Sequence, residues 1–424
     1  MERTGLGAQA ARCPHRPLYL RPVAMMPVRL GLERLVEDPA LVNGRRVAVL
    51  ANQASVTSDL EPAWRAVARA GAQVVRIFAP EHGLWGVAQD MEAVGEDREP
   101  ALGVPVVSLY GSTAETLTPR REHLAGLDAL VVDLPDIGCR YYTFAATMAH
   151  AMAACEAAGV EVIVCDRPNP IGGVALEGGP VQPACRSFVS ELPLPVRHGM
   201  TLGEVALLLR SARHPALSLS VLTCEGWRRD DWWDETGLPW VAPSPNMPSL
   251  TTVAVYPGAC LVEATNLSEG RGTTRPFQLI GAPWLDGETL AEHLGAAGVP
   301  GARFRATRFR PQFGKHAGSV CNGVEWHVTD RDAMRPLELG VRLLAEVRAL
   351  HPEKFSWRCE AYEFVADMPT IDLLTGSAAA RDVIEGRAAA DGVFGRWRSY
   401  CSEFNTLRAG VLLYPAMEQD RPSG

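Results

Sequence analysis

The stretch RVAVLANQASVTSDLEPAWRAVARAGAQVVRIFA, residues 46–79, decides the fold. Its first six residues form a continuous apolar run of strand length, and residues 73–79 form another. Between them, residues 60–70 carry apolar side chains at helical spacing and end at Gly71, a residue that commonly terminates helices. A strand, a helix and a second strand in this order are typical of a parallel sheet.

The same alternation continues along the chain. Apolar runs at residues 104–109, 129–134 and 160–165 predict three more strands, and an Ala-rich helix is expected over residues 141–158. Strands that are apolar on both faces are buried between two layers of helices. Right-handed crossovers place helices on both faces of such a sheet. The sequence therefore predicts a doubly wound α/β domain.

The pattern changes beyond residue 200. Thr201 and Glu204 have the spacing of a capping box at the start of a helix, a structural role, and residues 217–223 are expected to form a strand. The Trp- and Pro-rich residues 226–248 predict a long ordered loop. The elements expected after it are helices at 287–297, 336–350 and 378–385 and strands at 303–309 and 320–328.

These elements divide the chain into three parts. Residues 1–27 are expected to be a disordered extension, residues 28–252 the catalytic α/β domain, and residues 253–424 a smaller α+β auxiliary domain.

Composition excludes several classes of protein. Of 424 residues, 47% are hydrophobic and 21% charged, which is typical of a folded protein and not of a disordered one. No apolar run is long enough to span a bilayer, and a net charge of −8 without a basic cluster argues against nucleic-acid binding. The ten cysteines lack zinc or redox spacing, which suits a reducing compartment. With no apolar signal segment near the start, we expect a cytoplasmic protein.

Polar side chains follow every predicted strand of the first domain. In parallel sheets, ligands bind beyond the carboxyl ends of the strands, so these side chains are expected to line a polar cleft. The strand-end candidates are Asn52, Glu81, His82, Tyr110, Asp133, Asp136, Tyr142, Arg167 and Asn169.

Three common catalytic motifs are absent from the sequence. The first strand is followed by LANQASV and not by the glycine-rich turn of dinucleotide-binding proteins, and no phosphate-binding loop occurs. A G-x-S-x-G nucleophile elbow is also missing. Kinase, dehydrogenase and serine-esterase activities are therefore disfavoured, and we expect no cofactor.

Glu81 is the most specific single candidate for a catalytic residue. It lies at a strand end between Pro80 and the His82-Gly83 pair, where partial burial would suit a general acid. A helix cap or a surface salt bridge explains a glutamate here equally well. His82 has three open roles: orienting the carboxyl group, binding substrate or packing. Asp133 suits a buried structural role, whereas Asp136 is better placed to reach a ligand.

Two later segments carry further candidates. Arg197 and His198 precede the capped helix, where an arginine and backbone N–H groups can bind an anion. The polar loop 263–273 contains Glu263, Asn266 and Arg271, and an arginine between two glycines can approach a carboxylate closely. A solvated hinge is the alternative interpretation of this loop.

Seven motifs in order give the sequence a family resemblance. It resembles the exo-acting β-N-acetylmuramidases of the NamZ type, which are peptidoglycan hexosaminidases. The matching strings are FAPEHG (78–83), VPVVSLYG (104–111), DLPDIGCRYYTF (133–144), DRPNPIGG (166–173), RHGMTLGE (197–204), PSPNMP (243–248) and LVEATNLSEGRGT (261–273).

The resemblance implies a Rossmann-like domain joined to a smaller one, with the active site between them. It also implies release of N-acetylmuramic acid from the non-reducing end of wall fragments, with Glu81 as the catalytic residue. Two strings depart from the family. Leu134-Pro135-Asp136 replaces the usual D-I-Q-D, and GVAQDME at residues 86–92 replaces G-D-A-Q-A-G-E, which places the sugar preference in question.

Three hypotheses follow. In the first, Glu81 protonates the glycosidic oxygen, and Asp136 or Glu263 serves as the second carboxylate, or the acetamido group of the substrate itself replaces it. In the second, the cleft binds a wall sugar or polyol without cleaving it. In the third, Glu81, His82 and Asp136 hold a hydrolytic metal ion. The substrate-binding residues expected in the first hypothesis are Asn52, His82, Tyr110, Tyr142, Arg167, Asn169, Arg197, His198, Asn266 and Arg271, with Arg271 or Arg197 on the lactyl carboxylate.

Overall fold

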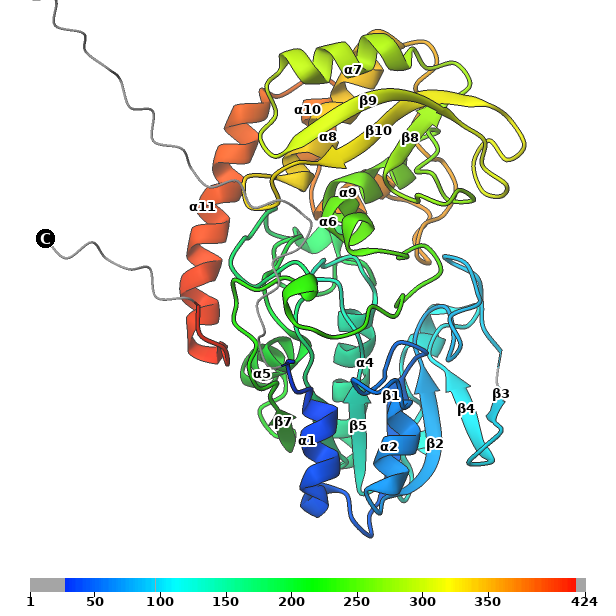
Figure 1. Cartoon of the computed structure of the whole chain (residues 1–424), viewed down its shortest axis with the longest axis vertical. Coiled ribbons are helices and arrows are strands. Elements are labelled where there is room, and N and C mark those ends of the chain that lie inside the picture. The colour runs from blue at the N-terminus through cyan, green and yellow to red at the C-terminus, as the bar shows by residue number, and fades with distance from the viewer. Residues whose placement is uncertain (1–26, 96, 417–424) are drawn as a thin grey trace, which may run out of the picture.

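A computed structural model describes residues 27–95 and 97–416 of the protein, and the expected extension 1–27 lies almost wholly outside them. Its two parts are visible in Figure 1, with a large sheet below and a small sheet above. The large sheet has the order β3-β4-β2-β1-β5-β6-β7, and all neighbours are parallel except β3 and β4. Its strands are β1 (Arg46–Ala51), β2 (Gln73–Ala79), β3 (Asp97–Glu99), β4 (Val104–Ser108), β5 (Ala129–Asp133), β6 (Glu161–Cys165) and β7 (Leu219–Leu222).

Helices cover both faces of this sheet, which confirms the doubly wound prediction. Alternate residues of β1 show the reason. Val47 and Val49 pack into a cluster with α1 and α2, while Ala48 and Leu50 pack on the other face with α3, α4 and α5. The helices are α1 (Gly31–Glu37), α2 (Ala63–Arg69), α3 (Arg121–Leu124), α4 (Phe144–Ala158) and α5 (Leu202–Arg213).

The predicted capping box at the start of α5 is confirmed. The Thr201 hydroxyl accepts a hydrogen bond from the Glu204 N–H at 3.2 Å, and the Glu204 carboxylate accepts one from the Thr201 N–H at 3.1 Å. Both residues therefore cap the N-terminus of α5, as expected.

The smaller part contains an antiparallel sheet of order β8-β10-β9, packed against helices. The hydrophobic core of the α4 face continues into this part through residues such as Val253, Trp326 and Leu344, so the two parts share one core. The boundary expected at residue 252 falls inside α6. The elements are α6 (Leu250–Ala259), β8 (Leu279–Ala282), α7 (Gly287–Ala296), β9 (Ala302–Phe309), β10 (Cys321–Val328), α8 (Pro336–Leu350), α9 (Thr370–Thr375), α10 (Ala379–Ile384) and α11 (Ala390–Arg408).

The helix α11 lies along the flank of both parts (Figure 1) and was not predicted from the sequence. Its buried side chains include Val393, Phe394, Trp397 and Phe404 at helical spacing, but two glycines and many polar residues obscure this pattern. At its end, Arg408 donates hydrogen bonds to the carbonyl groups of residues 173 and 199 in the first part. The sequence also did not predict α1, α3, α6, α9, β3 or β8.

The predicted long loop over residues 226–248 is confirmed, with one 3₁₀ turn at Trp233–Glu235. Within residues 27–95 and 97–416, no helix combines the length and apolar character needed to cross a bilayer.

Candidate active site

A polar cavity lies beyond the carboxyl ends of the large sheet, where its loops meet the smaller part. Five predicted residues line it: Glu81, His82, Tyr142, Glu263 and Arg271. The first three come from loops after β2 and β5, and the other two come from the segment after α6. The other residues that line the cavity are Asp90, Met91, Tyr141, Thr143, Ser244, Asn246, Met247, Tyr256, Phe277, Tyr362 and Glu363.

Glu81 is held by two hydrogen-bond donors on different loops. The Thr143 hydroxyl, just before α4, donates to Oε2 at 2.7 Å, and the Met91 backbone N–H donates to Oε1 at 3.1 Å. The residue is only 6% exposed, and among the described residues it forms no ion pair. A surface salt bridge therefore does not explain this glutamate. Both carboxyl oxygens have fixed positions in the cavity.

His82 lies beside Glu81 with a defined tautomer. Its Nδ1 lies 3.0 Å from the Ala88 carbonyl oxygen. Because a carbonyl group only accepts hydrogen bonds, Nδ1 carries the proton and Nε2 of the neutral ring is left as an acceptor. The ring can therefore accept a hydrogen bond from a hydroxyl group of a ligand.

Glu363, from the smaller part, brings a further buried carboxyl group to the cavity, beside those of Glu81 and Glu263. The Tyr110 hydroxyl donates to its Oε2 at 2.8 Å. Burial raises the pKa of Glu363 well above the usual value, and the negative charge of Glu81 adds to this effect. Burial likewise raises the pKa of Tyr110, so the phenol stays a donor. Of the four carboxyl groups that line the cavity, those of Glu81, Asp90, Glu263 and Glu363, the Glu363 group therefore retains its proton more readily than an ordinary glutamate.

Arg271 links the two parts across the cavity. Its Nη1 donates to Glu263 at 2.8 Å and to Glu269 at 3.2 Å, and its Nε lies 3.1 Å from the Asp90 carboxylate on the loop after β2. The Nε has no partner in hydrogen-bond geometry within the described structure. A bound carboxylate could therefore satisfy this nitrogen better than Asp90 does.

The neighbouring acids differ in their proton affinity. Burial raises the pKa of Glu263, and this effect outweighs the opposing charge of Arg271. Burial acts in the same direction on Glu269, but the charges of Lys315 and Arg271 outweigh it and lower the pKa of Glu269 to about 2.

Several residues that line the cavity have strained backbone conformations. Of the seven described non-glycine residues with positive φ, four line it: His82, Met91, Phe277 and Glu363. Each such conformation costs roughly 1–3 kcal/mol and persists only where the surroundings enforce it, most often at functional sites. The Phe277 ring is packed 4.9 Å below the Arg271 guanidinium. This clustering supports the cavity as the candidate active site.

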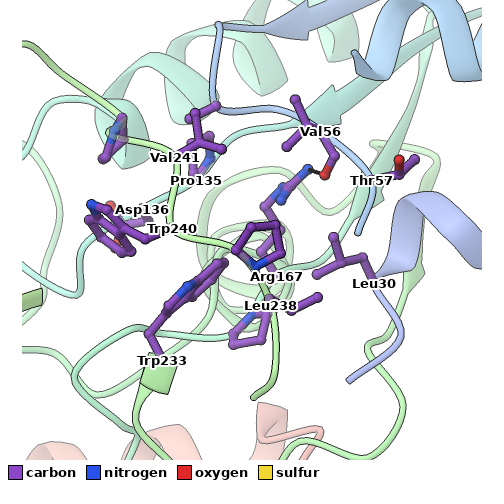
Figure 2. Close-up of a pocket in the computed structure, with 14 residues that line it drawn as sticks. Leu30, Val56, Thr57, Pro135, Asp136, Arg167, Trp233, Leu238, Trp240 and Val241 are labelled. Atoms are coloured by element: carbon purple, nitrogen blue, oxygen red, sulfur yellow. Dashed lines mark hydrogen bonds between the residues drawn. The ribbon is translucent and has the colours of Figure 1, made fainter. Parts of the chain in front are cut away.

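Asp136 and Arg167 line a separate, mostly apolar pocket (Figure 2). Arg167 binds both carboxylate oxygens of Asp133, at 2.6 and 2.7 Å, and the Val56 carbonyl oxygen at 2.6 Å. Asp136 accepts a hydrogen bond from the Gly138 N–H at 2.7 Å and lies 3.3 Å from His198 Nε2. This pocket lies beyond β1, β5 and β6, so neither residue shares the Glu81 cavity.

No described group of three or more His, Cys, Asp or Glu side chains is arranged to hold a metal ion. Asp136, which the metal hypothesis requires, lies apart from Glu81 and His82.

The other six predicted residues do not line the cavity; the structure places them in supporting contacts. Tyr110 holds Glu363, and His198 accepts a hydrogen bond from the Met200 N–H. The other contacts join Asn52 to Pro243, Asn169 to Met200 and Ile171, Arg197 to Ile171 and Glu177, and Asn266 to Lys354 and Ser356.

Sequence reasoning missed Thr143, Asp90 and Glu363 as site residues. Thr143 stands inside one of the quoted motifs, and Asp90 stands in the string that departs from the family, so both had a signal. Glu363 stands in EAYEFVAD, which carries no recognisable pattern. Only the packing of the two parts brings it into the cavity that Glu81 lines.

Known proteins resemble this chain along nearly its whole length. The family model described as Exo-beta-N-acetylmuramidase NamZ, N-terminal, matches residues 47–251, and the model described as Exo-beta-N-acetylmuramidase NamZ, C-terminal, matches residues 254–414. The chain is 38% identical over 389 residues to the peptidoglycan beta-N-acetylmuramidase NamZ of Bacillus subtilis (strain 168), a match that covers 91% of each protein.

Two crystal structures of DUF1343 family proteins from Bacteroides fragilis NCTC 9343 share the fold. One has a TM-score of 0.82 and 32% identity, and covers 92% of this chain and 99% of its own. The other has a TM-score of 0.71 and 27% identity, and covers 92% of this chain and 100% of its own.

Proposed function

The chain belongs to the NamZ exo-β-N-acetylmuramidase family, and from this premise we propose that it releases N-acetylmuramic acid from the non-reducing end of peptidoglycan fragments, with Glu81 as the general acid. Membership in this family makes the chain a glycosidase that acts on peptidoglycan. The identity of the catalytic carboxyl group and the preference for a terminal muramic acid are the proposed parts.

The buried position of Glu81 carries the proposal. Its carboxyl group lies in a cavity walled by both parts of the chain, and two donors fix its oxygens. A general acid needs such a fixed position to protonate the glycosidic oxygen while positive charge develops on the sugar ring. A pocket, unlike an open groove, suits a substrate that enters by its chain end.

Arg271 supports recognition of muramic acid. The lactyl carboxylate distinguishes this sugar from glucosamine, and an arginine can bind a carboxylate through two N–H groups. Arg271 lines the same cavity as Glu81. The Asp90 carboxylate lies 3.1 Å from its Nε, where a bound carboxylate would have to lie. We infer that the lactyl carboxylate replaces Asp90 in the bound state.

Replacement of Asp90 tests this step. In Asp90→Asn the competing anion is gone, so the inhibition constant of free N-acetylmuramic acid should fall about 2- to 5-fold, the scale of a partly exposed ion pair. Competition assays against a chromogenic muramide would measure it. The inhibition constant of N-acetylglucosamine, which lacks the carboxylate, should not change. Weaker inhibition by N-acetylmuramic acid would contradict the inference.

The pair Glu81 and Glu363 predicts a pH dependence. Because Glu363 has a raised pKa, the pair retains one proton at a pH where an ordinary glutamate has lost it, and activity should fall only as the pH rises through that raised pKa. In Glu363→Gln, the group with the raised pKa is absent. The alkaline limb of kcat/KM should therefore move to lower pH.

Tyr110→Phe is a control that should shift the alkaline limb of kcat/KM in the opposite direction. The Tyr110 hydrogen bond lowers the pKa of Glu363, so its removal should move the alkaline limb to higher pH. Profiles measured from pH 4 to 9 on one muramide would show both shifts. An unchanged limb in Glu363→Gln would show that the pair does not hold the proton.

Two disaccharides test the function itself. A β-linked disaccharide with N-acetylmuramic acid at its non-reducing end should be split into its two sugars, whereas the isomer with N-acetylglucosamine at that end should stay intact. Chromatography of the products separates these outcomes. Cleavage of both isomers, or of longer chains at internal bonds, would contradict the terminal specificity.

A further inference from the structure

An open groove lies next to the cavity, on the far side of Glu363. Its volume is about 320 Å³, within the usual range of small-molecule sites, roughly 300–1,000 Å³. Its walls include Phe188, Phe364 and Val365 with the polar side chains Arg186 and Glu191. Glu363 lines both the groove and the cavity, so the two spaces share this residue.

Glu363 and Phe364 belong to a strained turn. Tyr362 and Val365 exchange backbone hydrogen bonds at 2.8 and 2.9 Å, and the two residues between them, Glu363 and Phe364, have φ values of 46° and 68°. Positive φ at both central positions defines a type I′ hairpin turn, where asparagine and glycine are strongly preferred. A glutamate and a phenylalanine are among the residues that this turn disfavours.

The two side chains leave the turn toward different spaces. Glu363 is buried against Tyr110 and lines the cavity, whereas Phe364 is 39% exposed and lines the groove. The Phe364 ring lies 5.7 Å from the Tyr110 ring, which lies 6.2 Å from Phe188. A strained turn that keeps a large aromatic ring at the surface beside a cavity is better explained by binding than by folding.

We propose that this groove binds the saccharide that leaves during hydrolysis, with Phe364 as the platform on which its pyranose ring packs. The proposal rests on the proposed function. Glu363 lines both the cavity and the groove, so the groove adjoins the space of a terminal sugar bound in the cavity. The rest of the glycan must then extend into the adjoining space. The apolar face of a sugar ring packs on an exposed aromatic ring, and Arg186 and Glu191 can bind its hydroxyl groups.

Comparing two substrates distinguishes a role of Phe364 in binding the leaving saccharide from a general effect on activity. β-Muramyl fluoride places only a fluoride ion on the leaving side, whereas the muramyl–glucosamine disaccharide fills the groove. In Phe364→Ala, kcat/KM for the disaccharide should fall about 3- to 10-fold, the scale of one aromatic contact, while kcat/KM for the fluoride should stay within about twofold. Phe364→Tyr should restore the disaccharide value, because it keeps the ring.

Two further variants control for the turn and for the surface. Phe364→Gly removes the ring but suits the turn, so it should lose the disaccharide preference as Phe364→Ala does. Leu407→Ala removes another exposed apolar side chain, one that lines neither space, and should change neither substrate. An equal loss on both substrates, or no loss on the disaccharide, would overturn the groove assignment alone. A wild-type protein that cleaves neither substrate would overturn the proposed function and the groove assignment together.

Discussion

Glu81→Gln is expected to lower kcat on an unactivated muramyl disaccharide by about 10³-fold, within the range that a general acid contributes. The amide has the same shape as the carboxyl group and carries no proton to donate. Its oxygen can still accept the Met91 N–H, and its nitrogen can donate to the Thr143 hydroxyl, so the loop should keep its place. The melting temperature should therefore stay close to that of the wild type.

The leaving group distinguishes the acid role from other roles of Glu81. A dinitrophenyl muramide needs little protonation of its leaving group, so Glu81→Gln should retain much more activity on it than on the disaccharide. Glu92→Gln is a matched control, because Glu92 is an exposed acid on the same loop and its carboxylate accepts a hydrogen bond from the Gln89 N–H. Full turnover of the disaccharide by Glu81→Gln would remove this residue from catalysis.

Arg167→Met is expected to destabilise the protein by about 3–5 kcal/mol, the cost of leaving one partner of a buried ion pair uncompensated. Arg167 is 5% exposed and Asp133 is fully buried, and the arginine makes two short bonds to that carboxylate. Burial already raises the pKa of Asp133 against the opposing charge of Arg167. Loss of that charge leaves nothing to compensate the buried carboxylate.

Urea unfolding of four proteins would measure this effect. The wild type, Arg167→Met, Asp133→Leu and the double variant form a cycle, and the double variant should be more stable than Arg167→Met because it contains no unpaired buried charge. The Michaelis constant of folded Arg167→Met should match the wild type, since Arg167 lies outside the Glu81 cavity. A higher KM with an unchanged unfolding midpoint would instead support the substrate-binding role expected from the sequence.

The candidate site could be predicted only in part. Glu81 and His82 follow a strand, and Glu263 and Arg271 share one short loop, so local sequence predicted that each pair lies together, and all four residues line the cavity. Other strand-end residues, such as Asn52, face the same edge of the sheet without reaching the cavity. The loop 226–248 covers that part of the edge, and Asn52 binds the Pro243 carbonyl group within it.

The order of apolar and polar residues by itself determined the doubly wound sheet, its capped helix α5 and the glutamate after β2. These features depend on local periodicity and on the burial of both sheet faces. Both patterns can be read from the sequence of each segment alone. The partnership of Glu81 with Glu363 depends on the tertiary structure, since 282 residues separate them along the chain. No local pattern encodes such a pair, because the shared core of the two parts and a strained turn bring it together. The same packing decided that Arg167 holds Asp133 and does not line the cavity.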